Sequence, residues 1–239
     1  MSPLVTIVVV SYNHSRFIKE NLDSILSQTY PNIQLIVADD ASPDNSVEVF
    51  EEWLSDNNYP ALKNYHKKNT GLATTLNECI KLAKGKYIKL IAADDYLHPD
   101  AIEECVAKME ESGDQYGMVH TDTYCIDNSS TIIKDFANYN ELGNIDPLEF
   151  GKKLIEGNRI AALTVMMRLD VVIETGDYDA YYLAEDYYRW LMINNKYLIA
   201  YIPKKLAYYR LHENNISKLK AEKIEQENLI LKMLFDNEG

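Results

Sequence analysis

The sequence predicts an α/β protein with a Rossmann-like, mostly parallel sheet and helices on both faces. Short apolar, β-branched runs alternate with segments whose apolar residues recur at helical spacing. The connections between them are short, and polar or acidic residues follow several of the runs. The chain has 239 residues, 46% hydrophobic and 26% charged, which suits one such domain with a small annex.

The first half of the chain alternates regularly between the two patterns. Leu4–Val10 is an apolar run typical of a strand buried on both faces, and His14–Gln28 has apolar residues along one helical face. Asp44 or Asn45 is expected near the start of the second helix, and Gly85 is expected to end the third. The remaining expected strands are Asn32–Ala38, Ala61–His66, Lys86–Ala92 and Tyr116–Thr121, and the remaining helices are Asp44–Asp56, Leu72–Lys84 and Pro99–Glu111.

The second half is less regular and predicts a smaller, mixed portion of the same domain. A hairpin is expected over Cys125–Asp135, around Asn128-Ser129-Ser130. Helices are expected at Pro147–Ile155, Ala184–Asn194 and Lys218–Phe235, and strands at Ala161–Met167, Tyr197–Ile202 and Leu206–Tyr209. We therefore expect two halves, residues 1–122 and 123–239, within one domain.

The charge and cysteine content exclude several classes of protein. A formal net charge of −13 repels nucleic acid and anionic lipid, so no nucleic-acid partner is expected. The three scattered cysteines fit neither a disulfide framework nor a zinc cluster. No apolar run approaches the roughly 18–20 residues of a membrane span. Because Met1–Val10 also lacks the basic segment of a signal peptide, a cytoplasmic protein is expected.

Polar and acidic residues follow three of the expected strands. The first strand ends in Ser11-Tyr12-Asn13, the second in Asp39-Asp40-Ala41-Ser42, and the fourth is followed by Asp94-Asp95. Adjacent buried carboxylates repel each other, and a divalent cation with oxygen ligands would explain two such pairs at one edge. The alternative is helix capping, which accounts for one acid per turn but not two. His14, His66, His98 and His120 form no motif and are interpreted as incidental.

Several ordered motifs resemble the family 2 glycosyltransferases, which have the GT-A fold. The resemblance is dense over about residues 4–110 and returns more loosely near residues 183–186 and 209–212. Its motifs are Val9-Val10-Ser11-Tyr12-Asn13, Ser24-Ile25-Leu26-Ser27-Gln28-Thr29-Tyr30-Pro31, Val37-Ala38-Asp39-Asp40-Ala41-Ser42, Asn69-Thr70-Gly71 with Asn77, Ala83-Lys84-Gly85-Lys86-Tyr87-Ile88 before Asp94-Asp95, Leu183-Ala184-Glu185-Asp186, and Tyr209-Arg210-Leu211-His212.

The resemblance implies a role for each residue near the strand ends. Asp95 would bind Mn²⁺ or Mg²⁺, and Asp94 would touch the ribose or sugar of a nucleotide diphosphate sugar. Asp39 would accept a hydrogen bond from the base, which in this family is often uracil, and Val10 and Tyr12 would line the base pocket.

The later motifs are expected to complete the site. Asp186 would be the general base that activates the acceptor hydroxyl. Arg210 and His212 resemble an R-x-H element, which places Arg210 on the diphosphate and His212 with Asp95 at the metal. The sequence departs from the family pattern at Ala92, where many members carry another aspartate.

The resemblance implies an inverting, metal-dependent transferase acting in bacterial surface polysaccharide synthesis. Its first half would bind the sugar donor, and its second half would bind a saccharide or lipid-linked saccharide acceptor. The acceptor places it at the inner face of the plasma membrane, with peripheral association. Two alternatives are a sugar-phosphate nucleotidyltransferase, disfavoured because Ser11-Tyr12-Asn13-His14 contains no glycine, and a non-catalytic protein that binds nucleotide sugars.

Overall fold

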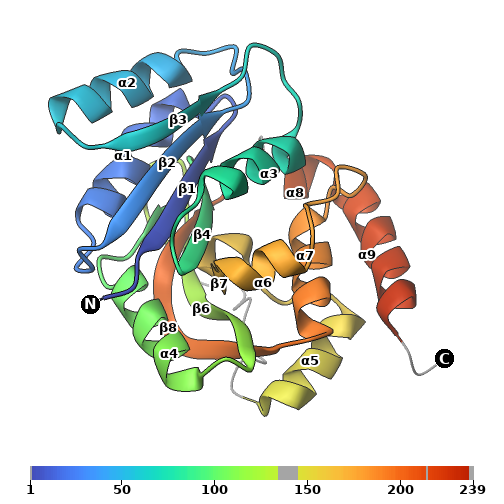
Figure 1. Ribbon diagram of the computed structural model, residues 1–239. Coiled ribbons are helices and arrows are strands. Elements are labelled where there is room, and N and C mark those ends of the chain that lie inside the picture. Colours follow the sequence, from blue (N-terminus) through green and yellow to red (C-terminus); the bar gives the residue numbers. More distant parts are fainter. Residues whose placement is uncertain (1, 134–144, 214, 237–239) are drawn as a thin grey trace.

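A computed structural model describes residues 2–133, 145–213 and 215–236. Its centre is an eight-stranded sheet with strand order β3-β2-β1-β4-β7-β6-β8-β5 (Figure 1). The strands are β1 (Val5–Ser11), β2 (Ile33–Asp39), β3 (Ala61–Tyr65), β4 (Tyr87–Ala92), β5 (Tyr96–Leu97), β6 (Tyr116–Ile126), β7 (Met166–Arg168) and β8 (Leu198–Arg210). The first four pair in parallel, which confirms the predicted fold class.

Helices cover both faces of the sheet. One hydrophobic core packs α1, α2 and α4 against one face, and a second core packs α3, α5, α6, α7 and part of α9 against the other. The helices are α1 (Ser15–Leu26), α2 (Ser46–Asp56), α3 (Leu72–Leu82), α4 (Ala101–Ser112), α5 (Pro147–Glu156), α6 (Leu169–Glu174), α7 (Glu185–Asn194), α8 (Ile216–Leu219) and α9 (Ala221–Phe235).

Strand β1 shows why its sequence is apolar throughout. Val5, Ile7 and Val9 point into the first core, while Val8 and Val10 point into the second. Successive side chains of a strand alternate between faces, so a strand covered on both sides needs an unbroken apolar run.

The register of the sheet brings the functional motifs to one edge. Ser11 at the end of β1 lies opposite Asp39 at the end of β2, and Val10 lies opposite Ala92 at the end of β4. Strand β8 runs antiparallel to β5, with Tyr208 opposite Tyr96, so its carboxyl end reaches the same edge. Residues that follow β1, β2, β4 and β8 therefore meet at the carboxyl edge of the sheet, where α/β folds bind ligands.

The second half differs from prediction in its strands. The two strands expected at Tyr197–Ile202 and Leu206–Tyr209 are one continuous strand, β8. Thr121 of β6 pairs with Ile202 and the next residue, Asp122, pairs with Lys205, so the two residues between, one of them Pro203, form a bulge. A bulge accommodates a proline without ending the strand. The strand expected at Ala161–Met167 is instead a 3₁₀ turn followed by the short β7.

The hairpin and the third helix also differ from prediction. The hairpin is reduced to a turn with one antiparallel bridge between Ile126 and Ile132, and its last two residues lie outside the described ranges. Helix α3 ends at Leu82, ahead of Gly85. The expected boundary between residues 122 and 123 falls inside β6, and the division into two halves stays a prediction.

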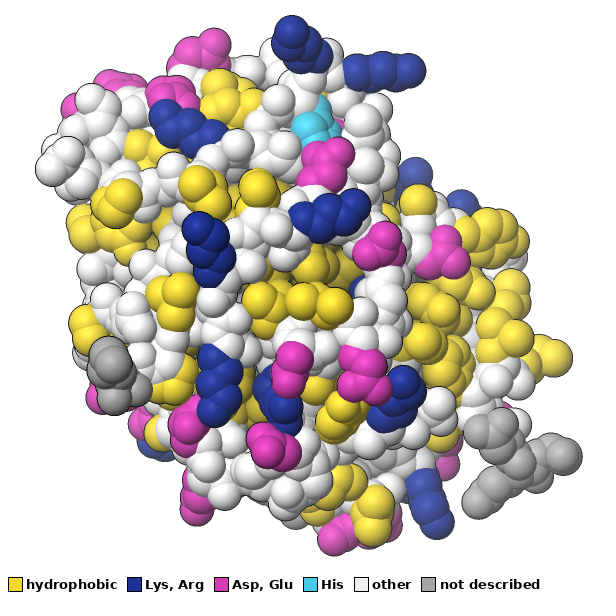
Figure 2. Space-filling view, in the orientation of Figure 1, with side chains coloured by type: hydrophobic (Ala, Val, Ile, Leu, Met, Phe, Trp, Pro, Cys, Tyr) yellow, Lys and Arg dark blue, Asp and Glu magenta, His cyan; other side chains and the backbone are white. Residues whose placement is uncertain are grey.

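Helix α9 lies at the periphery and buries only part of its surface. Leu231 is fully buried, while Leu229, Ile230, Met233 and Leu234 are exposed, and Figure 2 shows hydrophobic side chains gathered over this helix. Among the described residues, no helix combines the length and apolar character that crossing a membrane requires.

Candidate active site at the carboxyl edge of the sheet

Three side chains converge where β1, β4 and β8 end. His212 Nε2 lies 2.9 Å from Asp94 Oδ2, and His14 Nδ1 lies 3.6 Å from Asp94 Oδ1. One potential ligand atom from each residue lies within 4.8 Å of the other two. The three residues come from separate loops, so the cluster exists only in the folded chain. Two imidazole nitrogens and a carboxylate oxygen form a donor set suited to a divalent metal ion.

The hydrogen bonding of this cluster fits a metal ion. Asp94 is only 6% exposed, yet among the described residues neither its Oδ1 nor His14 Nδ1 has a hydrogen-bond partner. Buried polar atoms without partners are costly, and a shared cation would satisfy both. Burial raises the pKa of Asp94, but the His212 hydrogen bond and nearby His14 outweigh it and hold the pKa below its ordinary value. The carboxylate is therefore kept in the charged form that binds cations.

Asp95 occupies a different environment from its neighbour. Its Oδ1 accepts a 2.8 Å hydrogen bond from the backbone N–H of Arg210, and its carbonyl accepts one from Asn21. Burial and the adjacent Asp94 carboxylate raise the pKa of Asp95 well above the ordinary value. The structure thus brings His212 to Asp94, whereas the sequence had paired His212 with Asp95.

Arg210 lies beneath the site and is fully buried. Its Nε donates to the Asp94 carbonyl at 2.8 Å, its Nη1 donates to the Asp127 carbonyl at 2.8 Å, and its Nη2 is paired with Glu20. The guanidinium also lies over the Phe17 ring, 4.4 Å from its centroid. These contacts direct the Arg210 guanidinium inward. They favour a role in positioning the Asp94-Asp95 turn, rather than the predicted role in binding a diphosphate.

The expected nucleotide-base residues lie beside this cluster, at the ends of β1 and β2. Asp39 is fully buried, and its two carboxylate oxygens accept the N–H and O–H of Ser42 at 2.8 and 2.5 Å. Each carboxylate oxygen keeps a second lone pair, but Asp39 has no exposed surface, so its contact with a base stays a prediction. Val10 is 8% exposed, while Tyr12 is 49% exposed and accessible to a ligand.

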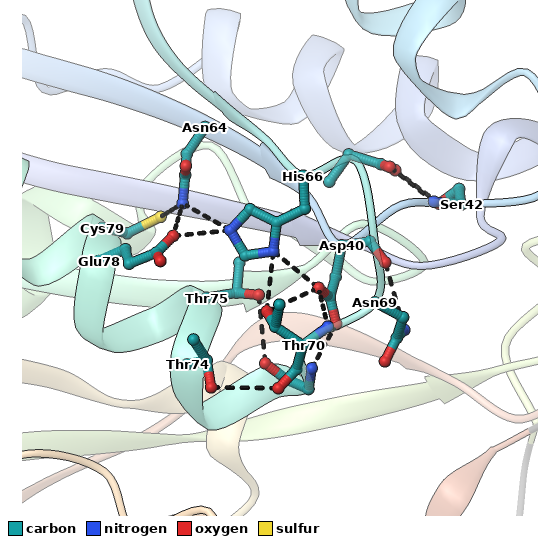
Figure 3. A network of polar contacts seen from close by, with 12 residues as sticks. Asp40, Ser42, Asn64, His66, Asn69, Thr70, Thr74, Thr75, Glu78 and Cys79 are labelled. Carbon is teal, nitrogen blue, oxygen red and sulfur yellow. Dashed lines mark hydrogen bonds and ion pairs between the residues drawn. The ribbon is translucent and has the colours of Figure 1, made fainter.

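The capping alternative holds for Asp44 but not for Asp40. Asp44 Oδ1 accepts the N–H of Ser46 at the start of α2, and its Oδ2 accepts the N–H of Ser15 at the start of α1. Asp40 instead accepts four hydrogen bonds from the segment after β3, through His66, Thr70 and Gly71 (Figure 3). These bonds outweigh burial, which would raise the pKa of Asp40, and hold that pKa below its ordinary value.

The predicted general base, Asp186, lies in the first turn of α7. Its Oδ1 accepts the N–H of Tyr187 at 2.6 Å, and Asn158 Nδ2 lies 3.5 Å from its Oδ2. Burial raises the pKa of Asp186, and burial together with Asp186 raises the pKa of Glu185 to about 8. Tyr181, which flanks this pair, is 74% exposed. The role of Asp186 as general base stays a prediction.

Two histidines that the sequence motifs leave out contact acids at the candidate site. His14 directly follows the Ser11-Tyr12-Asn13 motif, and that position was the only signal that it reaches the edge of the sheet. His66 likewise directly follows the last residue of a strand, Tyr65 of β3. The sequence motifs assign these two histidines no role, but the structure places His14 in the Asp94 cluster and His66 in a hydrogen bond with Asp40.

Sequence comparisons identify the family to which the chain is similar. Residues 6–169 match the family described as Glycosyl transferase family 2. An uncharacterized glycosyltransferase of Haemophilus influenzae is 30% identical over 95% of this chain and 73% of its own. The Escherichia coli UDP-Glc:alpha-D-GlcNAc-diphosphoundecaprenol beta-1,3-glucosyltransferase WfaP is 30% identical over 97% of this chain and 86% of its own. Other relatives are much longer: Pasteurella multocida chondroitin synthase is 38% identical over 44% of this chain, a match that covers 11% of its own length.

Solved structures share the fold. A crystal structure of S. aureus TarS 1-349 in complex with UDP-GlcNAc superposes with a TM-score of 0.77 at 16% identity, covering 98% of this chain and 67% of that crystallised chain. The mannosyltransferase PcManGT from Pyrobaculum calidifontis, in complex with GDP-Man and Mn²⁺, gives a TM-score of 0.72 at 18% identity, covering 98% of this chain and 64% of its own. At this identity the likeness establishes the GT-A fold alone.

Proposed function

Because the chain belongs to glycosyl transferase family 2, we propose that it transfers a sugar from a nucleotide diphosphate to an acceptor hydroxyl with inversion at the anomeric carbon. The observation that carries the proposal is the meeting of His14, Asp94 and His212 at the sheet edge that also carries Asp39. A cation at the first three residues and a base at Asp39 would bind the two ends of a nucleoside diphosphate.

The chain's own residues divide the binding of the sugar donor. Asp39 accepts a hydrogen bond from the base, and the ring of Tyr12, which follows β1, packs against the base. His14, Asp94 and His212 would hold the divalent ion, Mn²⁺ or Mg²⁺. When bound, the ion supplies Lewis-acid stabilisation of the charge on the leaving diphosphate.

The acceptor is activated from α7. Asp186 takes the proton of the acceptor hydroxyl as that oxygen attacks the anomeric carbon, a role typically worth about 10²–10⁴-fold in rate. The pKa of Asp186 is raised, and a general base works best when its pKa lies near the working pH. Residues from 123 onward form the acceptor half.

The names of relatives support a substrate class. WfaP uses UDP-glucose and a diphosphoundecaprenol-linked sugar, and TarS was crystallised with UDP-GlcNAc. We propose a UDP-sugar donor and a saccharide or lipid-linked saccharide acceptor in bacterial polysaccharide synthesis. Such an acceptor would bring the protein to the inner face of the plasma membrane as a peripheral protein.

Titration calorimetry with UDP tests the donor site. Wild-type protein should bind UDP tightly with Mn²⁺ and weakly with chelator, and His14→Ala should lose most of the metal dependence. Asp186→Asn should keep metal-dependent UDP binding while losing transfer. If metal does not change UDP affinity, the assignment of His14, Asp94 and His212 as the metal site is wrong.

Product analysis distinguishes the alternatives. With UDP-sugars and Mn²⁺, a transferase releases free UDP. A nucleotidyltransferase would instead release pyrophosphate from a nucleoside triphosphate, and a non-catalytic binding protein would release neither. Failure of every UDP-sugar tested to yield UDP, alongside tight UDP binding, would favour the non-catalytic alternative.

A further inference from the structure

We propose that His66 is a positioning residue that, as a doubly protonated imidazolium, holds Asp40 and the Asn69–Gly71 loop in the shape that the nucleotide-base site requires. The proposal deepens the proposed function and rests on it, because it takes the ends of β1 and β2 as that base site. Neither the sequence motifs nor the comparisons assign His66 a role.

The geometry around the ring requires a proton on both nitrogens. Nδ1 lies 2.8 Å from Asp40 Oδ1, and Nε2 lies 2.6 Å from Glu78 Oε2 (Figure 3). Ionised carboxylates only accept hydrogen bonds, so each nitrogen must donate. A neutral imidazole would leave one lone pair facing a carboxylate oxygen at hydrogen-bond distance. The imidazolium satisfies both, and its side chain is 10% exposed.

The groups that face the ring favour the charged form. Asp40 approaches from the end of β2 and Glu78 from α3, while Thr70 Oγ1 lies 2.9 Å from Nδ1. Burial lowers the pKa of His66, but the two carboxylates outweigh it and raise that pKa above its ordinary value. The nearby Cys79 thiol carries no charge at neutral pH, because burial raises its pKa to about 11.

The imidazolium connects to the base site through Asp40. The Asp40 carboxylate accepts the backbone N–H groups of Thr70 and Gly71, both at 2.8 Å. The backbone N–H of His66 also donates to the carbonyl of Asp39, at 2.8 Å. His66 thus contacts both residues of the acidic pair, one through its main chain and one through its ring.

The backbone after the pair needs this support. Ala41 has a φ of +58°, in the left-handed region that residues other than glycine adopt only when surrounding contacts hold them there. Ala41 lies between Asp40 and Ser42, whose N–H and O–H bind Asp39. Loss of the charge on His66 would release Asp40 from one side, and the loop bearing Asp39 and Ser42 would loosen.

The first experiment measures the protonation of His66 directly. Imidazole signals in ¹H–¹³C NMR spectra of the full chain should show His66 doubly protonated at pH 7, with a titration midpoint above about 6.5, the ordinary value. Glu78→Gln should lower that midpoint, because it removes one of the two facing charges. A neutral His66 ring at pH 7 overturns the proposal.

The second experiment measures UDP affinity with Mn²⁺ by calorimetry. His66→Gln should weaken binding about tenfold at pH 7, the typical effect of one charge-assisted hydrogen bond. The matched control, His98→Gln, replaces a partly exposed histidine of another loop and should bind as wild type does. Because His14 and His212 also titrate, every variant should show some pH dependence. As pH rises through the His66 midpoint, the difference in UDP affinity between wild type and His66→Gln should shrink, while the control should follow wild type at every pH.

The outcomes separate this proposal from the proposed function. Equal UDP affinity for wild type and His66→Gln, with the same pH dependence, overturns the positioning role and leaves the transferase assignment standing. If correctly folded wild type binds no UDP at any pH, the proposed function fails and the positioning role with it. Should His66→Gln not fold, Glu78→Gln decides, because Glu78 is 45% exposed in its side chain and its loss should weaken UDP binding at pH 7.

Discussion

Glu227 on α9 is a buried carboxylate that secures the start of α7, and its replacement by alanine should destabilise the protein markedly. Glu227 is 5% exposed, and its Oε2 accepts the N–H groups of Leu183 at 2.6 Å and Ala184 at 3.0 Å. Ala184 is the residue before α7 and has no polar side chain of its own to cap the helix. Glu227 therefore acts as a cap supplied by a distant helix.

The size of the effect follows from these two bonds. A hydrogen bond to a charged group contributes about 1.5–3 kcal/mol, and relief of the buried charge of Glu227 offsets part of the loss. We expect Glu227→Ala to lower the free energy of unfolding by about 3 kcal/mol, which corresponds to a fall in Tm of roughly 6–12 °C for a chain of this size. Glu227→Gln keeps one acceptor oxygen and should cost about 1 kcal/mol.

Thermal and urea unfolding of the purified variants measure these differences. Glu225→Ala is the matched control, because Glu225 lies on the same helix and is exposed; it should change stability by less than about 0.5 kcal/mol. If Glu227→Ala unfolds at the same temperature as Glu225→Ala, the argument that α9 caps α7 is refuted.

Three further perturbations probe other parts of the chain. Gly85→Ala would place a Cβ within 2.4–2.8 Å of three backbone atoms, so we expect little soluble protein, and a melting temperature near wild type contradicts this. Between pH 4.5 and about 8 the folded protein holds a proton on Glu185 that the unfolded chain releases, so the free energy of unfolding falls as pH rises through that window. Urea unfolding at several pH values should show a smaller fall in Glu185→Gln than in wild type. Equal falls in the two proteins would contradict the raised pKa of Glu185. Asn77 exchanges hydrogen bonds of 2.9 and 2.7 Å with the carbonyl and N–H of Tyr178; Asn77→Asp should cost about 2 kcal/mol in urea unfolding, and an unchanged midpoint argues against this link.

The sequence predicted the first half of the fold well because its signals are local. The apolar run of β1 and the helical spacing in α1 reflect burial on known faces, and both are where the periodicity placed them. In the second half, β7 is only three residues long and pairs antiparallel between β4 and β6. A strand that short depends on its neighbours, so no periodicity within it can predict it.

The site was predicted at the level of motifs but not of partners. The Asp94-Asp95 motif and His212 were identified, yet which carboxylate meets the imidazole depends on the register between β5 and β8. With Tyr96 opposite Tyr208, the N–H of Arg210 meets Asp95, and His212 reaches Asp94. Register between strands more than a hundred residues apart leaves no trace in either segment alone.

The four buried acids at the edge of the sheet differ in how their charge is compensated, and this difference indicates which of them is best suited to the proposed cation. Asp39 is bound by the N–H and O–H of Ser42, and Asp40 by backbone N–H groups and His66. Asp95 accepts an N–H, and its raised pKa favours the neutral acid. Of these four, Asp94 alone combines a lowered pKa with a buried oxygen that no group in the described part of the chain hydrogen-bonds. In a chain of net charge −13, the diphosphate of the proposed donor would be repelled from this edge unless a cation lay between, and Asp94 is the carboxylate best placed to hold that cation.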